Sequence, residues 1–267
     1  MKLLKTIAFS ILGLISASTY AQEFNADLQL RPRYEYRNGY KSLLKTTDNP
    51  TSFISQRSRL NLDFKQDRLK LKLSLQNVRT WGDVPTTTTT DKNGVAVFEA
   101  YAEYSFDEKW STRIGRQTLS YDNQRIMGAI DWIQQGQSHD AALISYKDKK
   151  NQLDLGFAHN ANAENLLEPA TAYATTYKEM QYAWYQTNIK KVNASFLLLN
   201  AGYQFLKTPT DPQTDYIQTY GTYITYKAKK WDFDLGVYGQ CGKSSGTDLS
   251  AMNAGGNLGY ALSPKFK

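Results

Sequence analysis

The sequence contains one cysteine and two histidines, and this scarcity excludes several kinds of site. Cys241 alone permits no internal disulfide, so the chain is not a small secreted module held by disulfides. His139 and His159 lie apart and form no cluster with the spacing of metal ligands. We therefore expect no metal site and no cofactor. The chain is only mildly basic and carries no nucleic-acid-binding motif, so we expect no nucleic-acid partner either.

Catalytic motifs are equally scarce. Ser138, His139 and Asp140 are neighbours in the sequence, but a catalytic triad is defined by geometry and not by adjacency. The stretch 239–246 superficially resembles a phosphate-binding loop, yet its spacing is wrong and it joins two expected strands. We expect that the protein is not an enzyme.

Long apolar runs are also missing after the first twenty-one residues, so no helical membrane span is expected. Residues 1–21 form a basic start, a short apolar stretch and small residues before position 22, as in a signal peptide cleaved after Ala21. An uncleaved helical anchor is the weaker reading because the apolar stretch is too short. With no nearby cysteine, a lipoprotein is not expected. The mature part, 22–267, would leave the cytoplasm with a net charge of about +5.

Strict alternation of apolar and polar residues is what the sequence does have. From Phe24 to Arg37 the even positions are apolar or aromatic, ending in tyrosines, and the odd positions are polar with three arginines. Successive side chains of a strand point to opposite faces. A mean hydropathy of −0.56 and an aromatic content of 13% fit a strand with lipid on one side and water on the other.

The same period predicts about twelve strands. They run near 24–37, 53–65, 68–79, 95–106, 110–119, 140–146, 153–160, 179–190, 192–205, 216–226, 231–240 and 249–262.

The connections between these strands alternate between long and short. Long ones at 38–52 and 80–94 precede short ones at 66–67 and 107–109, and we expect the same rhythm to continue to the loop 242–248. Outer-membrane barrels have tight periplasmic turns and long outer loops. We therefore predict an all-β protein, a transmembrane antiparallel up-and-down β-barrel in the outer membrane of a Gram-negative bacterium, with its N-terminus periplasmic. A soluble secreted β-protein is the alternative.

The other strands show the same pattern as the first, with apolar side chains at the alternate positions that would face lipid. In the fourth strand we expect Phe98, Ala100, Ala102 and Tyr104 to face outward. Trp110 and Trp231 would each meet the periplasmic interface, because they follow short turns. The strand 192–205 is apolar on both faces, so the pattern does not specify its register.

Basic residues on the inward positions are the candidate solute path, since a ring of cations raises the local concentration of anions. They are Arg31, Arg33, Arg37, Arg57, Arg59, Lys70, Lys72 and Arg113. The alternative is that they pair with acidic residues of the wall and only stiffen it. Those acids are Glu35, Asp63, Glu99 and Glu103. Arg116 would fall on the lipid face by alternation, so either a bulge at Gly115 turns it into the lumen or the expected register slips there, and we predict the bulge.

The run 114–140 resembles a block of the alginate-export family of outer-membrane porins, as do the fragments 30–35, 56–60 and 81–83. The matching residues of the block include Gly115, Gln117, Tyr121, Arg125, Asp131, Trp132 and Asp140. The resemblance spans most of 23–146. It implies a channel of eighteen strands that passes anionic polysaccharide or another anionic solute, and outer-membrane lipid as its surroundings.

We therefore predict a porin with an arginine-lined, anion-selective lumen, with an anionic polysaccharide or oligosaccharide such as alginate as a candidate solute. A non-conducting barrel with a structural or adhesion role is the alternative. Ser263-Pro264 reads as a further turn and 265–267 as a strand beginning, so we expect a C-terminally truncated barrel. The other reading is a complete twelve-stranded barrel that closes 24–37 against 249–262. The sequence specifies neither the solute, the direction of transport, the oligomeric state, nor whether long loops enter the pore.

Overall fold

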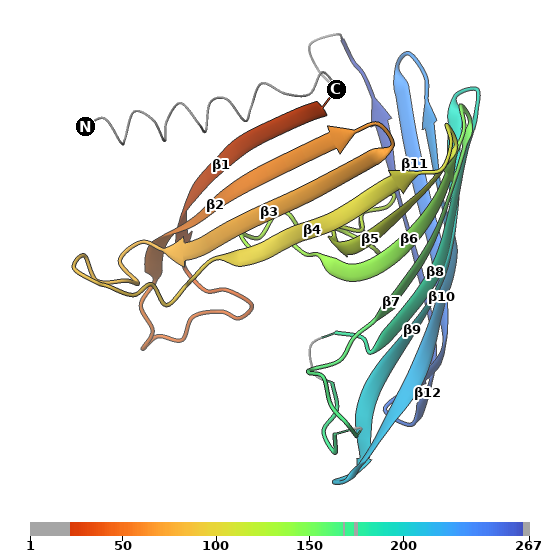
Figure 1. Cartoon of the computed structure of the whole chain (residues 1–267). Coiled ribbons are helices and arrows are strands. Elements are labelled where there is room, and N and C mark those ends of the chain that lie inside the picture. The colour runs from red at the N-terminus through yellow and green to blue at the C-terminus, as the bar shows by residue number, and fades with distance from the viewer. Residues whose placement is uncertain (1–21, 168, 174–175, 264–267) are drawn as a thin grey trace, which may run out of the picture.

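A computed structural model describes residues 22–167, 169–173 and 176–263. These residues form one antiparallel sheet of twelve strands in sequence order, and the sheet curves strongly along its width (Figure 1). Within the described residues no helix is long and apolar enough to cross a membrane. The expected signal peptide and the expected strand beginning at 265–267 lie outside the described residues.

The twelve strands agree in number and order with the pattern of alternation. They are β1 Gln22–Arg37, β2 Thr51–Gln66, β3 Leu69–Thr80, β4 Ala96–Ser105, β5 Trp110–Gln117, β6 His139–Lys147, β7 Asn151–His159, β8 Glu179–Ile189, β9 Val192–Thr208, β10 Asp211–Lys227, β11 Trp231–Ser244 and β12 Thr247–Tyr260.

The expected alternation of β1 is confirmed. Phe24, Leu28 and Tyr34 are each more than 60% exposed on one face, and Arg31 and Arg33 are partly covered on the other. β1 pairs with β2 in unbroken register from Gln22 to Arg37. In the described residues β1 pairs only with β2 and β12 only with β11, so the twelve-stranded closure is not observed.

The rhythm of long and short connections is confirmed up to β9 and is wrong beyond it. β9 and β10 are 17 residues each and meet at a tight turn, residues 209–210, where a longer loop was expected. β11 and β12 also continue to a two-residue turn, Ser245-Gly246, in which both residues have positive φ. Such a turn matches the twist of the flanking strands, so the β11–β12 hairpin extends instead of opening into a loop.

Phe98 was expected on the outer face, and that prediction is wrong. The ladder between β3 and β4 shifts register at Ser74/Leu75, where Ser74 faces Glu99 and Leu75 faces Val97. The extra residue is Phe98, which is 7% exposed. Its ring lies against the guanidinium of Arg59, with the Cζ atom of Arg59 3.5 Å from the centroid of the Phe98 ring. A bulge re-aims a side chain without changing the sequence pattern around it.

The main apolar core lies on the inward face of the sheet, and Figure 1 shows this face to be the concave one. Leu143, Trp184 and Leu197 come from β6, β8 and β9, and Leu119 and Met127 come from the connection between β5 and β6. Packing also resolves the register of β9, because Leu197 is 2% exposed while its neighbours Phe196 and Leu198 are exposed. Burial under a segment that is distant in the sequence therefore determines which face of β9 points inward, which alternation alone does not specify.

Candidate functional site: the concave face and its inner segment

Residues 118–138, which we call the inner segment, join β5 to β6 across the concave face. One end reaches β1, where Arg31 donates hydrogen bonds to the carbonyls of Asp131 and Ile133 at 2.7 and 2.8 Å. The other end reaches β11, where the Tyr238 hydroxyl donates to Asp122 at 3.4 Å. Because one segment touches strands ten places apart in the sheet, the sheet must curve around it.

Arginines of β1 and β2 hold the inner segment largely by its main chain. Arg33 donates to the Trp132 carbonyl at 2.6 Å, and Arg59 donates to the Gln135 carbonyl at 3.4 Å. Main-chain carbonyls accept these hydrogen bonds whatever the side chains are, so the arginines recognise the backbone conformation of the segment and not its side chains. This use of the arginines is a third one, beyond the solute path and the wall pairing that the sequence suggested.

Arg57 is the most enclosed of these arginines, with 1% of its side chain exposed. Its guanidinium donates to the Asp131 carboxylate at 2.7 Å, to the Gln134 carbonyl at 3.3 Å and to the Gln29 side chain at 2.5 Å. Although partial burial acts to raise the pKa of Asp131, the hydrogen bond and charge of Arg57 hold that pKa below its usual value. Asp131 therefore stays ionised and fixes the segment to β2.

The remaining basic residues of the predicted path pair mostly with the predicted acids. Glu35 binds Arg33 and Arg37, Asp63 binds Lys72, and Glu103 binds Lys70 and Arg113. Glu99 instead accepts a hydrogen bond from the main-chain N–H of Thr118 at 3.1 Å. Counting Asp131, the eight predicted cations face five carboxylates. Lys65, Glu23 and Asp27 lie on the same face, so the wall carries an excess of two positive charges. We call this surface of β1–β5 the basic wall.

The bulge predicted at Gly115 is wrong, and Arg116 does not join the basic wall. The β4–β5 ladder runs through Gly115 without a shift, although Gly115 has a φ of 123°. Arg116 stays on the face of Ile114 and forms an ion pair with Asp140 of β6 at 2.7 Å. Both side chains lie at the ends of their strands, where a charge on the outer face costs least.

The residues of the family-like block occupy the inner segment and its two anchoring strands. Gln117 is fully buried and donates to the Ala141 carbonyl at 2.9 Å, which joins the ends of β5 and β6. The Tyr121 hydroxyl lies 2.9 Å from that of Tyr182. Arg125 and Trp132 leave their side chains exposed, in contrast to Gln117. The residues of the block therefore belong to one continuous part of the structure, the inner segment with the strands β5 and β6 that hold its two ends.

A cavity of about 720 Å³ opens beside the basic wall at the end of β1–β3 that carries the long connections. Its lining combines three cations and two carboxylates, Glu35 and Asp83, with aromatic rings. It includes Arg33, Arg37, Arg79, Tyr40, Phe53 and Trp132. Arg37 lies over the rings of Tyr40 and Phe53 at 4.3 and 4.6 Å from their centroids. Such a surface can bind a carboxylate by its cations while the rings contact the apolar face of a solute.

Sequence reasoning assigned no role to three residues that organise this face. Gln134 is 3% exposed and donates to Ser55 while accepting from Arg31. Asp122 and Asp154 lie near the opposite end of the inner segment. Their roles depend on contacts across the concave face, and no period in the sequence signals a contact of that range.

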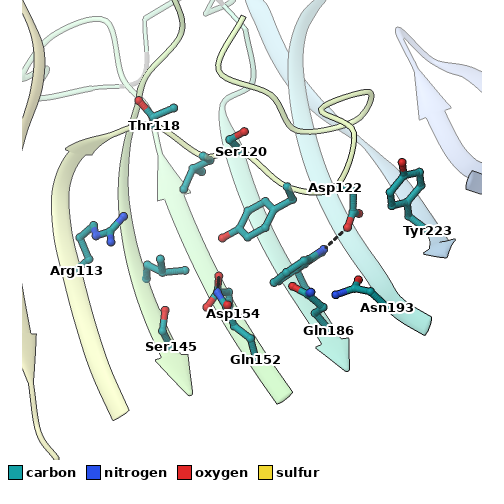
Figure 2. A pocket seen from close by; sticks show the side chains of 14 residues that line it. Arg113, Thr118, Ser120, Asp122, Ser145, Gln152, Asp154, Gln186, Asn193 and Tyr223 are labelled. Atoms are coloured by element: carbon teal, nitrogen blue, oxygen red, sulfur yellow. Dashed lines mark hydrogen bonds between the residues drawn. The ribbon is translucent and has the colours of Figure 1, made fainter. Parts of the chain in front are cut away.

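Asp122 ties the inner segment to the strands beyond β7 (Figure 2). Its carboxylate accepts hydrogen bonds from the Trp184 indole at 3.2 Å and from the Ser195 hydroxyl at 2.6 Å, besides Tyr238. Burial raises the pKa of Asp122, and these hydrogen bonds act against that rise. The segment is thus fixed at one end by the side chains of Arg31, Arg33, Arg57 and Arg59, which we call the arginine cradle. At the other end it is fixed by the carboxylate of Asp122.

Comparison with protein families gives one match, to the family described as alginate export, over residues 22–267. No curated protein matches the chain.

Solved outer-membrane proteins resemble the fold at low sequence identity. OccK2 (OpdF) of Pseudomonas aeruginosa aligns at 10% identity with a TM-score of 0.50, over 90% of this chain and 61% of that one. OccAB4 of Acinetobacter baumannii aligns at 12% identity with a TM-score of 0.48, over 87% of this chain and 71% of that one. A loop L8 deletion mutant of OmpT, an outer membrane protein of Vibrio cholerae, aligns at 11% identity with a TM-score of 0.42, over 92% and 90%.

Proposed function

Because the chain belongs to the alginate-export family of outer-membrane channels, we propose that it conducts anionic solutes, with carboxylated saccharides as the solute class. We also infer a transporter and not an enzyme, which the match to an alginate-export family supports. The observation that carries the proposal is the positive excess of the basic wall beside the concave face. Cations held in a wall of low dielectric raise the local concentration of anions along the path.

The guanidinium groups of Arg33 and Arg37 are the ones we assign to the solute. They are 40% and 33% exposed, share a single carboxylate, Glu35, and line the 720 Å³ cavity. Arg57 and Arg59, in contrast, are committed to the inner segment. The predicted path thus divides into arginines that only position the segment and arginines that meet solute, and of the latter Arg33 also donates to the Trp132 carbonyl of the segment.

The orientation follows from the connections. Tight turns such as 67–68 and 190–191 lie at one edge of the sheet, and the long connections 38–50 and 81–95 lie at the other. We propose that the long connections face outward and that the N-terminus is periplasmic. The ring pairs Trp110–Tyr146 and Trp231–Tyr260, next to the tight turns, support this, since aromatic girdles mark the interfaces.

Flux into proteoliposomes tests the proposal. A galacturonate trisaccharide should enter faster than an uncharged trisaccharide of the same size, and the double variant Arg33→Gln/Arg37→Gln should remove most of this preference. Lys229→Gln, which removes a cation from the turn 228–230, is the matched control and should leave the preference unchanged. Equal entry of both sugars would sink the anion assignment, and no entry of either would favour the non-conducting barrel.

A further inference from the structure

A second cavity, of about 510 Å³, lies on the concave face between the inner segment and strands β5–β10 (Figure 2). Its lining is unlike the basic wall, since it combines carboxylates, amides and hydroxyls with aromatic rings. We propose that this cavity, which we call the Asp154 pocket, is a binding subsite for an uncharged, hydroxyl-rich saccharide unit. Its volume falls in the range of small-molecule sites.

The carboxylate of Asp154 is the first observation that points to a ligand. Asp154 is 3% exposed, and its Oδ2 atom accepts a hydrogen bond from Gln152 at 3.0 Å. Its Oδ1 atom is buried and has no hydrogen-bond partner among the described residues. A buried acceptor without a donor is costly, and a ligand hydroxyl would remove that cost.

The other lining groups suit a sugar. Gln186, Asn193 and Ser145 offer amides and a hydroxyl from three different strands, which can both donate and accept. The rings of Tyr121 and Trp184 lie 4.7 Å apart and form one aromatic side of the pocket. A site that converges a few polar groups on an aromatic surface is typical of small-molecule binding.

Charge excludes the solute class assigned to the basic wall. The pocket is lined by two carboxylates, Asp122 and Asp154, and by a single cation, Arg113. The guanidinium of Arg113 is already committed to Glu103, with its Nε atom 2.9 Å from that carboxylate. A sugar carboxylate placed here would therefore meet negative charge without a free cation to offset it.

A metal ion fits no better. Among the described residues there is no group of three or more His, Cys, Asp or Glu that could hold one. Asp122 is also engaged, since its two oxygens accept hydrogen bonds from Trp184, Ser195 and Tyr238. Only Asp154 keeps an open acceptor, and one open acceptor beside amides favours a hydroxyl donor.

The subsite goes beyond the proposed anion conduction and does not depend on it. Calorimetric titration of the folded chain in detergent with cellobiose, an uncharged disaccharide, tests it directly. Cellobiose should bind, and Asp154→Asn should weaken binding about tenfold, because a hydrogen bond to a charged acceptor is replaced by a weaker one. Asp248→Asn, which changes an exposed carboxylate of β12, is the matched control and should bind cellobiose as the native chain does.

Asn193→Ala provides a second variant, with a several-fold loss expected, in case Asp154→Asn does not fold. Heat-modifiable gel mobility checks the fold of each variant. Absence of cellobiose binding to the native chain, unchanged binding by folded Asp154→Asn, or binding of glucuronate or Ca²⁺ in place of cellobiose would each overturn the proposal. Loss of anion preference in the flux experiment would leave it intact, so the two proposals fail separately.

Discussion

Arg57 links the inner segment to β2 through its own side chain. Replacing it in Arg57→Gln removes the contact with Asp131 and shortens the side chain below the reach of the Gln134 carbonyl. We expect the free energy of unfolding to fall by about 2 kcal/mol, the range for hydrogen bonds to a charged group. Urea unfolding in detergent measures this fall.

Arg79→Gln is the control for that variant. Arg79 pairs with Asp91 near the rim and is one-third exposed, so its removal should change the free energy of unfolding by less than about 0.5 kcal/mol. A similar effect of both substitutions would show that Arg57 has no special part in holding the segment. In planar bilayers Arg57→Gln should also raise the single-channel conductance, because the inner segment is freed at one end.

Asp131 gives the attachment of the inner segment a defined pH dependence. Its pKa in the folded protein lies below the usual carboxyl value, mainly because Arg57 opposes the effect of burial. A lowered pKa contributes stability that is present above the ordinary carboxyl pKa, about 3.9, and is lost as the pH falls through the folded value. Conductance should therefore stay constant from pH 7 to about pH 5 and change only in stronger acid. A change centred near pH 6 would contradict this assignment.

At the scale of the strands, close packing on the concave face sets where glycine is required. A Cβ atom at Gly156 of β7 would collide with the ring of Tyr182, whereas a Cβ atom at Gly255 of β12 would meet nothing within 4 Å. Overpacking of this kind costs about 2 kcal/mol. Gly156→Ala should lower the unfolding temperature measured by gel mobility, and Gly255→Ala should not. Equal effects would mean that the Tyr182 contact does not form.

The long connections provide a test of orientation. A short epitope placed in the threonine tract 86–90, between β3 and β4, should be labelled on intact cells. The same epitope in the turn 107–109 should be labelled only after the outer membrane is opened. The reverse result would place the N-terminus on the outside.

Alternation predicted the strands because it reports the two solvents on either side of a sheet. It placed Arg31 and Arg33 on one face and Leu28 and Tyr34 on the other, as the structure has them. It failed at Phe98, where a bulge changes the face without any change in composition.

Only part of the candidate site could be predicted from the sequence. The cations of the wall follow from strand period, and the residues of the inner segment drew notice only through a family resemblance. The contacts between them join residues about a hundred positions apart, such as Arg31 with Gln134. Local patterns carry no information on such pairs, so neither the arginine cradle nor the Asp154 pocket could be predicted.

At the scale of the whole molecule, the inner segment divides the concave face into two chemically unlike parts. The basic wall of β1–β5 carries the excess of cations, and the Asp154 pocket between β5 and β10 carries carboxylates and amides. Carboxylated saccharides would meet the basic wall, and uncharged saccharide units would meet the Asp154 pocket. Specificity would then come from two surfaces of opposite character on one path.

Anion selectivity of that path is the central claim, and the reversal potential tests it most directly. The folded chain is inserted in a planar bilayer with a tenfold gradient of KCl, and the potential at zero current is read. We predict a potential of the sign that shows Cl⁻ to be more permeant than K⁺, and a shift toward zero in Arg33→Gln/Arg37→Gln. A potential that shows K⁺ to be more permeant, or a value of zero in the native chain, would contradict the account.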